Sequence, residues 1–233
     1  MKKLSYQKKT PRKIPNNIQL PSISDIRWFR KRLISWFNLN KRYFPWRTSK
    51  NSYEIIIAEL FLQQTNANKV AQILPVFLDK YPSWESIING SRRDIESIIT
   101  PLGLFRRRCV TLYSLAQTII SDPVIPNTRD KLEELSGIGQ YIASVILVTV
   151  HGKRAPFLDV NMSRVIERFF GNRQLADIRY DPYLQTLSRK IVNVKDCLSA
   201  NWMILDFASL VCSKRLPKHD QCPLNERCKS AQF

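Results

Sequence analysis

The stretch LEELSGIGQYIASVI (Leu132–Ile146) holds Gly137 and Gly139, two of the chain's six glycines, between two runs of helical character. Because glycine costs about 1 kcal/mol in a helix interior, the pair predicts a break between two helices. Glycine also lets the backbone turn tightly and come close to a partner. The second helix then presents N–H groups and the positive end of its dipole, which suit a phosphate. The stretch therefore predicts a helical hairpin, either an ordinary one or one that binds a phosphate.

The rest of the chain is also predicted to be helical. Ser24 can cap a helix that begins at Asp25, and Ser91 can cap another, with Asp94 three residues later. The segment 145–150 (VILVTV) has the composition of a strand, but its position behind the glycine break favours a helix. Further helices are expected over the apolar run that starts at Ser52 and over 67–80, 105–121, 127–135, 140–151, 159–170, 182–194 and 200–211. The fold class is therefore all-α.

The composition indicates a globular protein with a polyanionic partner. Of 233 residues, 44% are hydrophobic, and 37 Lys and Arg against 19 Asp and Glu give a net charge of +18. Such an excess suggests nucleic acid or an anionic membrane surface, but no apolar run approaches the roughly 20 residues of a membrane span. Residues 1–21 read as a basic flexible tail, and no apolar segment typical of a signal peptide follows its first basic residues.

The cysteines suggest a metal site. Their number, five, is odd, and three of them lie in the last 22 residues. This distribution is more typical of a metal site in a reducing compartment than of a disulfide framework. We therefore expect a cytoplasmic protein, which in a prokaryote would associate with the nucleoid.

Three further stretches carry a resemblance to a known family. HGKRAPFLDVNMSRVIERFFG (151–171) follows the hairpin with a Gly/Pro loop and an aspartate. FPWRTSKNSYEIIIAELFLQQT (44–65) and LDFASLVCSKRLPKHDQCPLNERC (205–228) lie on either side of this core. Together they resemble, in collinear order over about 25–230, the helix-hairpin-helix (HhH-GPD) superfamily of DNA base-excision glycosylases, in its endonuclease III and adenine glycosylase branch.

The resemblance implies a fold of two helical lobes. Residues 51–150 would form a six-helix barrel that contains the helix-hairpin-helix. Residues 22–50 and 151–233 would form a second lobe that carries an iron–sulfur cluster loop. Double-stranded DNA with a mismatched or damaged base would lie across the cleft between the lobes, and the protein would act as a monomer without a membrane partner.

Two carboxylates match catalytic positions of the family. Asp159 corresponds to the catalytic aspartate, which would stabilise positive charge that develops on the sugar, although an aspartate there can equally be a helix N-cap. Glu59 lies in the apolar run IIIAELFL, where a buried, unpaired charge costs several kcal/mol. By resemblance Glu59 contacts the flipped base, and burial would raise its pKa so that it donates a proton to the leaving base. The alternative is a structural carboxylate bonded to backbone or arginine.

Tyr141 marks a departure from the strand-cleaving members of the family. Endonuclease III-like enzymes carry a lysine at this position, and that lysine forms a Schiff base with the sugar. Tyrosine cannot do so, so we expect base removal without backbone cleavage. Tyr141 as a plain packing residue leads to the same expectation.

The resemblance also assigns DNA contacts. Gln64 would fill the hole left by the extruded base, Gln63 would help to sense the orphan base, and Leu104 or Phe105 would act as a wedge. The arginines Arg106, Arg107 and Arg108 can meet phosphates, and the hairpin would contribute Gly137, Gly139 and Gln140. Without the resemblance, the glutamines and arginines would read as an ordinary solvated surface.

The cysteine loop keeps the family's ligand spacing but changes one ligand. The family pattern C-x6-C-x2-C-x5-C falls here on Cys212, His219, Cys222 and Cys228. Imidazole ligates iron in some clusters, so the expected cofactor is a [4Fe–4S] cluster with Cys3His ligation. A Cys3His set also suits zinc, and a loop without metal is a third possibility.

The target base is expected to be thymine or uracil opposite guanine. The segments LDFASLVC and VNMSRVIERFFG, together with Tyr141, resemble the thymine/guanine mismatch glycosylases. The chain ends five residues after Cys228, so we expect no separate domain that reads oxidised guanine. In contrast, LQQT (62–65) is typical of the adenine branch. The alternatives are an adenine glycosylase acting opposite guanine or 8-oxoguanine, and a catalytically silent binder of DNA damage.

Overall fold

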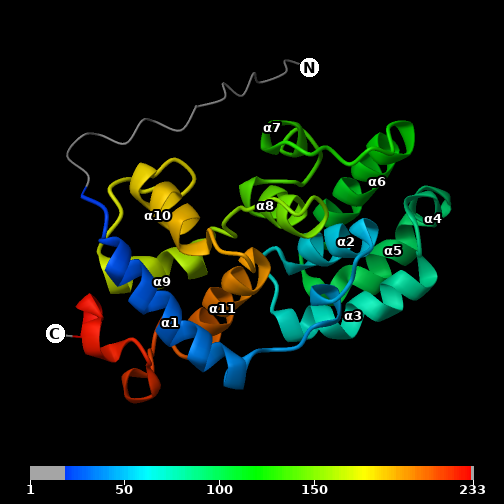
Figure 1. Cartoon of the computed structure of the whole chain (residues 1–233). Coiled ribbons are helices and arrows are strands. Elements are labelled where there is room, and N and C mark those ends of the chain that lie inside the picture. Colours follow the sequence, from blue (N-terminus) through cyan, green and yellow to red (C-terminus); the bar gives the residue numbers. More distant parts are fainter. Residues whose placement is uncertain (1–18, 232–233) are drawn as a thin grey trace. The chain divides into compact units, whose positions relative to one another are not determined.

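The computed structural model describes residues 19–231 and is built from helices, as predicted; none of these residues lies in a β-strand (Figure 1). The chain divides into two compact units, Arg42–Lys153 and a second made of Met1–Lys41 with Arg154–Phe233. We call them the inserted unit and the terminal unit. The sequence-based expectation put the corresponding boundaries at 50/51 and 150/151. Of the predicted tail 1–21, residues 1–18 lie outside the described residues.

The inserted unit is organised around one central helix. Its α-helices are α2 (Ser52–Leu62), α3 (Ala67–Lys80), α4 (Trp84–Asn89), α5 (Arg92–Ile99), α6 (Phe105–Ser121), α7 (Arg129–Leu132) and α8 (Gln140–Thr149). Because α2 is apolar on most faces, it is buried by its neighbours: Ile56, Ile57 and Phe61 are fully buried, and α2 packs against α3 and α8.

The terminal unit brings together the two ends of the described chain. It contains α1 (Ile23–Asn40), α9 (Val160–Phe170), α10 (Pro182–Val192) and α11 (Cys197–Leu210). Short 3-10 turns follow at His219–Gln221, Asn225–Arg227 and Lys229–Ala231. Helix α11 packs against α1 and α9, and Phe29, Leu33 and Phe207 are buried in the core of this unit.

The helix boundaries depart from the sequence prediction in two places. The first helix is capped by Ser22, whose Oγ accepts a hydrogen bond from the Asp25 N–H at 3.1 Å, so the prediction that Ser24 is the cap is wrong. The sequence predicts six helices in the inserted unit but not α4, a six-residue helix closed by a capping box between Ser83 and Ser86. So short a segment gives little periodicity to detect. The strand-like VILVTV segment continues α8, and α8 extends to Thr149.

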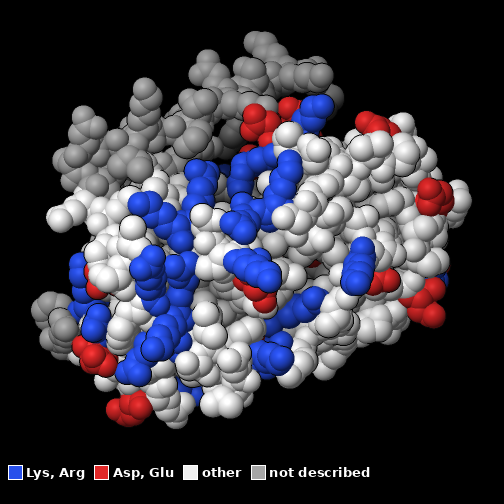
Figure 2. All heavy atoms as spheres, viewed as in Figure 1, with Lys and Arg blue, Asp and Glu red and all other residues white. Residues whose placement is uncertain are grey.

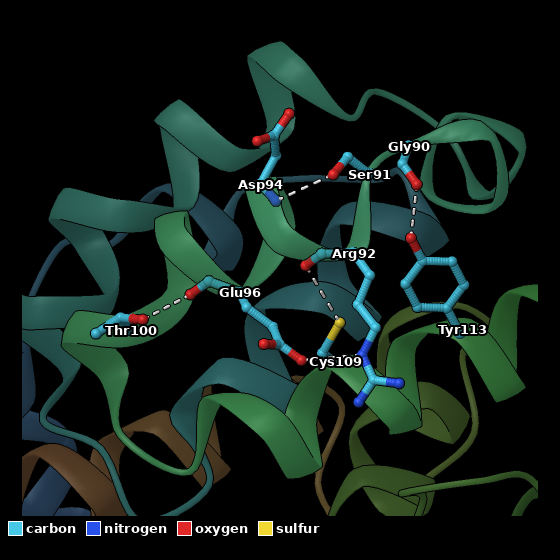
Figure 3. Close-up of polar contacts among 8 residues, drawn as sticks. All are labelled: Gly90, Ser91, Arg92, Asp94, Glu96, Thr100, Cys109 and Tyr113. Carbon is cyan, nitrogen blue, oxygen red and sulfur yellow. Dashed lines mark hydrogen bonds and ion pairs between the residues drawn. The ribbon is translucent and has the colours of Figure 1, made fainter.

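Polar contacts fix α5 against α6 (Figure 3). The Tyr113 hydroxyl donates to the Gly90 carbonyl at 2.7 Å, and the Cys109 thiol lies 3.9 Å from the Arg92 carbonyl. The first contact joins the C-cap of α4 to α6, and the second joins the start of α5 to α6. The loop that leads from α5 into α6, which contains the predicted wedge residues, therefore begins and ends on fixed helices.

Candidate active site

The two glycines of the hairpin have different structural roles. Gly137 has a φ of +78°, and a Cβ placed on it would lie 2.3 Å from Cγ2 of Thr111 and 3.0 Å from Cδ2 of Leu60. Gly139 has an ordinary φ of −97°, is exposed, and would have no atom within 4 Å of an added Cβ. Gly137 is therefore required by packing inside the unit, whereas Gly139 keeps the outer surface open.

The start of α8 holds the other predicted hairpin residues. Gly139 is the N-cap of α8 and offers no side chain, so the first N–H groups of the helix lack a side-chain cap. Gln140 is half-buried and its carbonyl accepts from Arg129 at 3.2 Å. Tyr141 packs, partly buried, against the core of the inserted unit. No amine stands at position 141.

The end of α2 carries three predicted site residues. Glu59 is only 2% exposed, as its place in an apolar run predicts. The Gln63 side-chain Nε2 donates to the Gly137 carbonyl at 2.9 Å, so this residue joins α2 to the hairpin. Gln64 is exposed and has a φ of +56°.

The loop before α6 carries the predicted wedge. Leu104 is 50% exposed with a φ of +50°; Phe105, which begins α6, is half-buried. Arg106 and Arg107 are exposed, as any contact with a phosphate requires, and their phosphate contacts stay a prediction. Arg108 is 6% exposed and bonded to backbone oxygens, so the expectation that it reaches phosphates is wrong.

Asp159 is both an N-cap and a partly buried carboxylate. It caps α9 by accepting hydrogen bonds from the N–H groups of Asn161 (2.9 Å) and Met162 (2.8 Å), and Oδ2 accepts from Asn161 Nδ2 at 2.6 Å. Burial raises the pKa of the Asp159 carboxyl, while these hydrogen bonds and the charge of Arg164 act to lower it. The N-cap role weighed from the sequence is confirmed, and it leaves the carboxylate partly buried.

Asn201 supports the loop that leads to Asp159, and the sequence gives only a faint sign of it. Its Oδ1 accepts from the Phe157 N–H at 2.7 Å, and its Nδ2 donates to the Ala155 carbonyl at 3.0 Å. Asn201 is fully buried. An asparagine inside the apolar run of α11 is the one signal that could have indicated this support.

The four predicted metal ligands surround one cavity of the terminal unit. The cavity measures about 190 Å³, and Cys212, His219, Cys222 and Cys228 all line it together with Arg168. Among residues 19–231, no three His, Cys, Asp or Glu side chains converge closely enough to hold a single metal ion. The ligands are therefore spread around a space more than about ten times larger than one water molecule needs.

Without a bound cation, the surroundings of the cavity favour neutral thiols at Cys222 and Cys228. The Arg168 guanidinium donates to Cys212 Sγ at 3.4 Å, and Cys212 and Cys228 are buried. Burial raises the pKa of the Cys222 and Cys228 thiols, and the neighbouring thiols raise it further. Mutual repulsion between thiolates is the effect that a bound cation relieves.

Basic side chains gather on the terminal unit. In Figure 2, lysines and arginines crowd the surface over α1 and α9, while acidic side chains are scattered. Helix α1 contributes Arg27, Arg30, Lys31 and Arg32. Within the described part of the chain, no helix has the length and apolar character needed to cross a membrane.

Comparisons with known proteins agree with this arrangement. The family model described as "HhH-GPD superfamily base excision DNA repair protein" matches residues 57–185. A thymine-DNA glycosylase of Aeropyrum pernix is 33% identical over 85% of this chain and 92% of its own length. A thymine/uracil-DNA glycosylase of Pyrobaculum aerophilum is 35% identical over 88% of this chain and 92% of its own length. The solved structure of a thermostable thymine-DNA glycosylase superposes with a TM-score of 0.83 at 29% identity, covering 90% of this chain and 97% of the other. The chain therefore belongs to the HhH-GPD superfamily of base excision DNA repair proteins.

Proposed function

We propose that this protein is a monofunctional DNA glycosylase that removes thymine or uracil paired with guanine in double-stranded DNA. Relatives named as thymine and thymine/uracil glycosylases align with this chain over almost their whole length. This similarity supports the choice of thymine or uracil as the base. The net charge of +18 supports a nucleic-acid partner. The protein would act as a monomer.

The observation that carries the proposal is the geometry of Asp159. Its carboxylate is partly buried and held by hydrogen bonds from Asn161 and Met162 at the start of α9. The transition state of N-glycosidic bond hydrolysis has positive charge on the sugar. A preorganised carboxylate in a poorly solvated site stabilises such charge strongly and can orient the attacking water.

Glu59 is assigned to the leaving base. Burial of a carboxyl group disfavours its charged form, and Glu59 is almost fully buried in α2. A neutral carboxylic acid can donate a proton to the departing base. The bond electrons then leave with the base, and water adds to the sugar. The proton that the water loses returns through solvent to the Glu59 carboxylate, which restores the neutral acid.

The exposed residues of the inserted unit are assigned to the duplex. Extrusion of a base costs a few kcal/mol; Gln64 and Leu104, both exposed, would fill the vacated space. Phe105 would support Leu104, and Gln63 would read the orphan base. Arg106 would bind phosphate with the open backbone of Gly139 and Gln140 at the start of α8, and Gly137 would set the hairpin turn.

The absence of an amine at position 141 is why we propose a monofunctional enzyme. A Schiff base with the sugar requires a primary amine, and Tyr141 offers a phenol instead. The product would be an abasic site in an intact strand. Tyr141 would then shape the pocket for the base.

We also propose that Cys212, His219, Cys222 and Cys228 hold a [4Fe–4S] cluster. The cavity of about 190 Å³ and the spread of the ligands around it favour a multi-atom group over a single zinc ion. Such a cluster would supply a cross-link within the loop and a redox centre. No step of the hydrolysis proposed above passes through it.

The glycosylase proposal is tested with labelled duplexes that carry each mismatch. We expect T:G and U:G strands to break after alkali treatment and to stay intact without it, and borohydride to trap no covalent adduct. Release of adenine from A:G or A:8-oxoguanine instead would favour the adenine glycosylase. Tight binding to mismatches without release of any base would favour the silent binder.

The cluster proposal is tested by metal analysis of anaerobically purified protein. We expect iron and sulfide near four each, as the cluster type requires, and His219→Cys should retain them while His219→Ala should retain less. Stoichiometric zinc without sulfide would replace the cluster with a zinc site. A folded, active protein without metal would show that packing alone holds the loop.

A further inference from the structure

Two residues of the inserted unit have an unusual backbone conformation. Among residues 19–231, Gln64 and Leu104 are the non-glycine residues with positive φ, at 56° and 50°. A left-handed conformation costs a non-glycine residue free energy and persists only where the surroundings impose it. Both residues are exposed, so their own side chains do not impose it.

Arg108 donates hydrogen bonds to the backbone next to each of these two residues. Its Nε donates to the Gly103 carbonyl at 2.9 Å, directly before Leu104. Its Nη2 donates to the Gln63 carbonyl at 2.6 Å, directly before Gln64, and to Thr65 Oγ1 at 2.7 Å. One guanidinium therefore holds the backbone next to both strained residues.

The surrounding bonds extend this arrangement into a network. Arg108 Nη1 also donates to the Leu60 carbonyl, and Thr65 Oγ1 donates to the Leu102 carbonyl at 2.9 Å. The Gln63 side chain donates to the Gly137 carbonyl. The end of α2, the loop before α6 and the hairpin turn are thus linked through one buried arginine.

The buried position of the Arg108 charge costs free energy of folding. Arg108 is 6% exposed, and its four acceptors are neutral oxygens. Burial lowers the pKa of its guanidinium, which reflects the loss of hydration. A cation in the first turn of α6 also opposes that helix's dipole, although its bonds to the last carbonyls of α2 are favourable. A buried charge kept without a carboxylate partner is a stability cost.

We propose that Arg108 is a positioning residue that holds Gln64 and Leu104 in place for insertion into the DNA duplex. The inference rests on the proposed function, because it assigns Arg108 to base extrusion and not to the bond cleavage. Side chains that are already ordered lose less entropy when they enter the base stack. Arg108 would therefore matter for duplex substrates, in which the base must be extruded, and little for single-stranded ones.

The test compares Arg108→Met with Arg93→Met, a matched change at an exposed arginine of α5. Uracil release is measured under single-turnover conditions from a U:G duplex and from single-stranded DNA. We expect Arg108→Met to lower the duplex rate at least tenfold more than the single-strand rate, and Arg93→Met to change both less than twofold. Equal losses on the two substrates, or no loss, would overturn the proposal.

Hydrogen exchange gives a readout that does not depend on activity. The amides of 63–65 and 103–105 should exchange faster in Arg108→Met than in Arg93→Met; unchanged exchange would overturn the proposal. If the wild type releases neither thymine nor uracil, the proposed function fails, and the exchange result alone decides the role of Arg108 in holding these segments. Should Arg108→Met not fold, Arg108→Lys keeps the charge and should show an intermediate duplex-specific loss, whereas wild-type behaviour would contradict the proposal.

Discussion

The starts of α9 and α6 are built in opposite ways. The N-cap of α9 is Asp159, whose carboxylate accepts hydrogen bonds from the N–H groups of Asn161 and Met162. The N-cap of α6 is Leu104, which has a left-handed backbone and gives no side-chain cap. Its first turn contains Arg106, Arg107 and Arg108 and no acidic residue. Arginine there opposes the helix dipole, whereas the carboxylate at α9 matches it.

The difference separates two kinds of functional helix end. At α9 the functional group accepts hydrogen bonds from the helix itself, so one side chain supplies both the cap and the group used in the proposed chemistry. At α6, and at α8 with Gly139 as its N-cap, the helix starts lack a side-chain cap and remain receptive to an anion. The capped start of α9 holds a carboxylate in one position, as catalysis requires. The starts of α6 and α8, which lack a side-chain cap, can bind a phosphate of the DNA instead.

The largest effect is expected for Asp159→Asn. Asparagine can keep the cap of α9 but removes the charge that we propose stabilises the transition state, so base release should fall roughly 10³-fold. Binding to a mismatched duplex should change little, because little of this charge acts in the ground state. Single-turnover excision and a binding titration measure the two quantities.

Thermal unfolding of the same variant tests independently whether the charge of Asp159 stabilises or destabilises the fold. Burial raises the pKa of Asp159 in the folded protein above its value in the unfolded chain. Ionised Asp159 therefore destabilises the fold at pH values above the folded-state pKa. Below the unfolded-state pKa the group is protonated in both states, and this effect is absent. Asp159→Asn should therefore raise the melting temperature at neutral pH, with the gain disappearing in acid. A lower melting temperature at neutral pH would mean that the carboxylate is chiefly a structural cap.

The two hairpin glycines should differ most in stability. Gly137→Ala forces a left-handed alanine, which costs about 1–2 kcal/mol, and sets its Cβ 2.3 Å from Thr111 Cγ2. We expect a loss of about 2 kcal/mol or more in the free energy of unfolding, partly restored by Thr111→Ala. Gly139→Ala should leave stability almost unchanged and weaken binding to duplex DNA. Equal stability for the two variants would refute the division of roles.

Local sequence signals predicted most of the helices and the hairpin. Apolar periodicity located α3 and α6 at their observed bounds, 67–80 and 105–121, because amphipathic helices carry their burial pattern in the sequence. The Gly-x-Gly pair likewise marks the turn before α8. Ser22 and Ser24 are both plausible caps, and only the geometry of the Asp25 N–H distinguishes them.

The roles of single polar residues depended on tertiary structure. Arg106, Arg107 and Arg108 are consecutive and chemically identical, and the phase of α6 alone turns Arg108 inward. Gln63 is bonded to Gly137, which is 74 positions away. Contacts of this range leave no local pattern, so the sequence predicted the residue types of the candidate site but not the network that holds them.

Substitution of Leu104, the proposed wedge, by glycine should change stability and excision rate in opposite directions, by modest amounts. Leu104→Gly removes the side chain and the left-handed strain of about 1–2 kcal/mol, against an entropy cost of about 0.5–1 kcal/mol for glycine. We expect equal or slightly higher stability and about tenfold slower excision from duplexes, since extrusion costs a few kcal/mol. Leu104→Ala should be equally slow but less stable than Leu104→Gly. Unimpaired excision in both would remove Leu104 from the proposed machinery.

The smallest effect is expected for Asn161→Ala, which leaves the cap of α9 intact. Asn161 Nδ2 donates to Asp159 Oδ2 at 2.6 Å and so favours the charged carboxylate. Its removal should raise the pKa of Asp159 further, because burial already raises it and one opposing bond is lost. In the proposed mechanism the carboxylate is the active form, so the acid limb of the single-turnover rate should move to higher pH, with the plateau unchanged. The variant also removes the hydrogen bond that Arg164 Nη1 donates to Asn161 Oδ1 at 3.1 Å. Arg164, whose charge also lowers this pKa, keeps its bonds to the Cys212 and Ala208 carbonyls. Asn172→Ala, an exposed asparagine of the same unit, serves as the control and should leave the limb in place. A shift to lower pH would show that Asn161 stabilises the protonated form, and the start of α9 would then need a different account from the one its geometry supports.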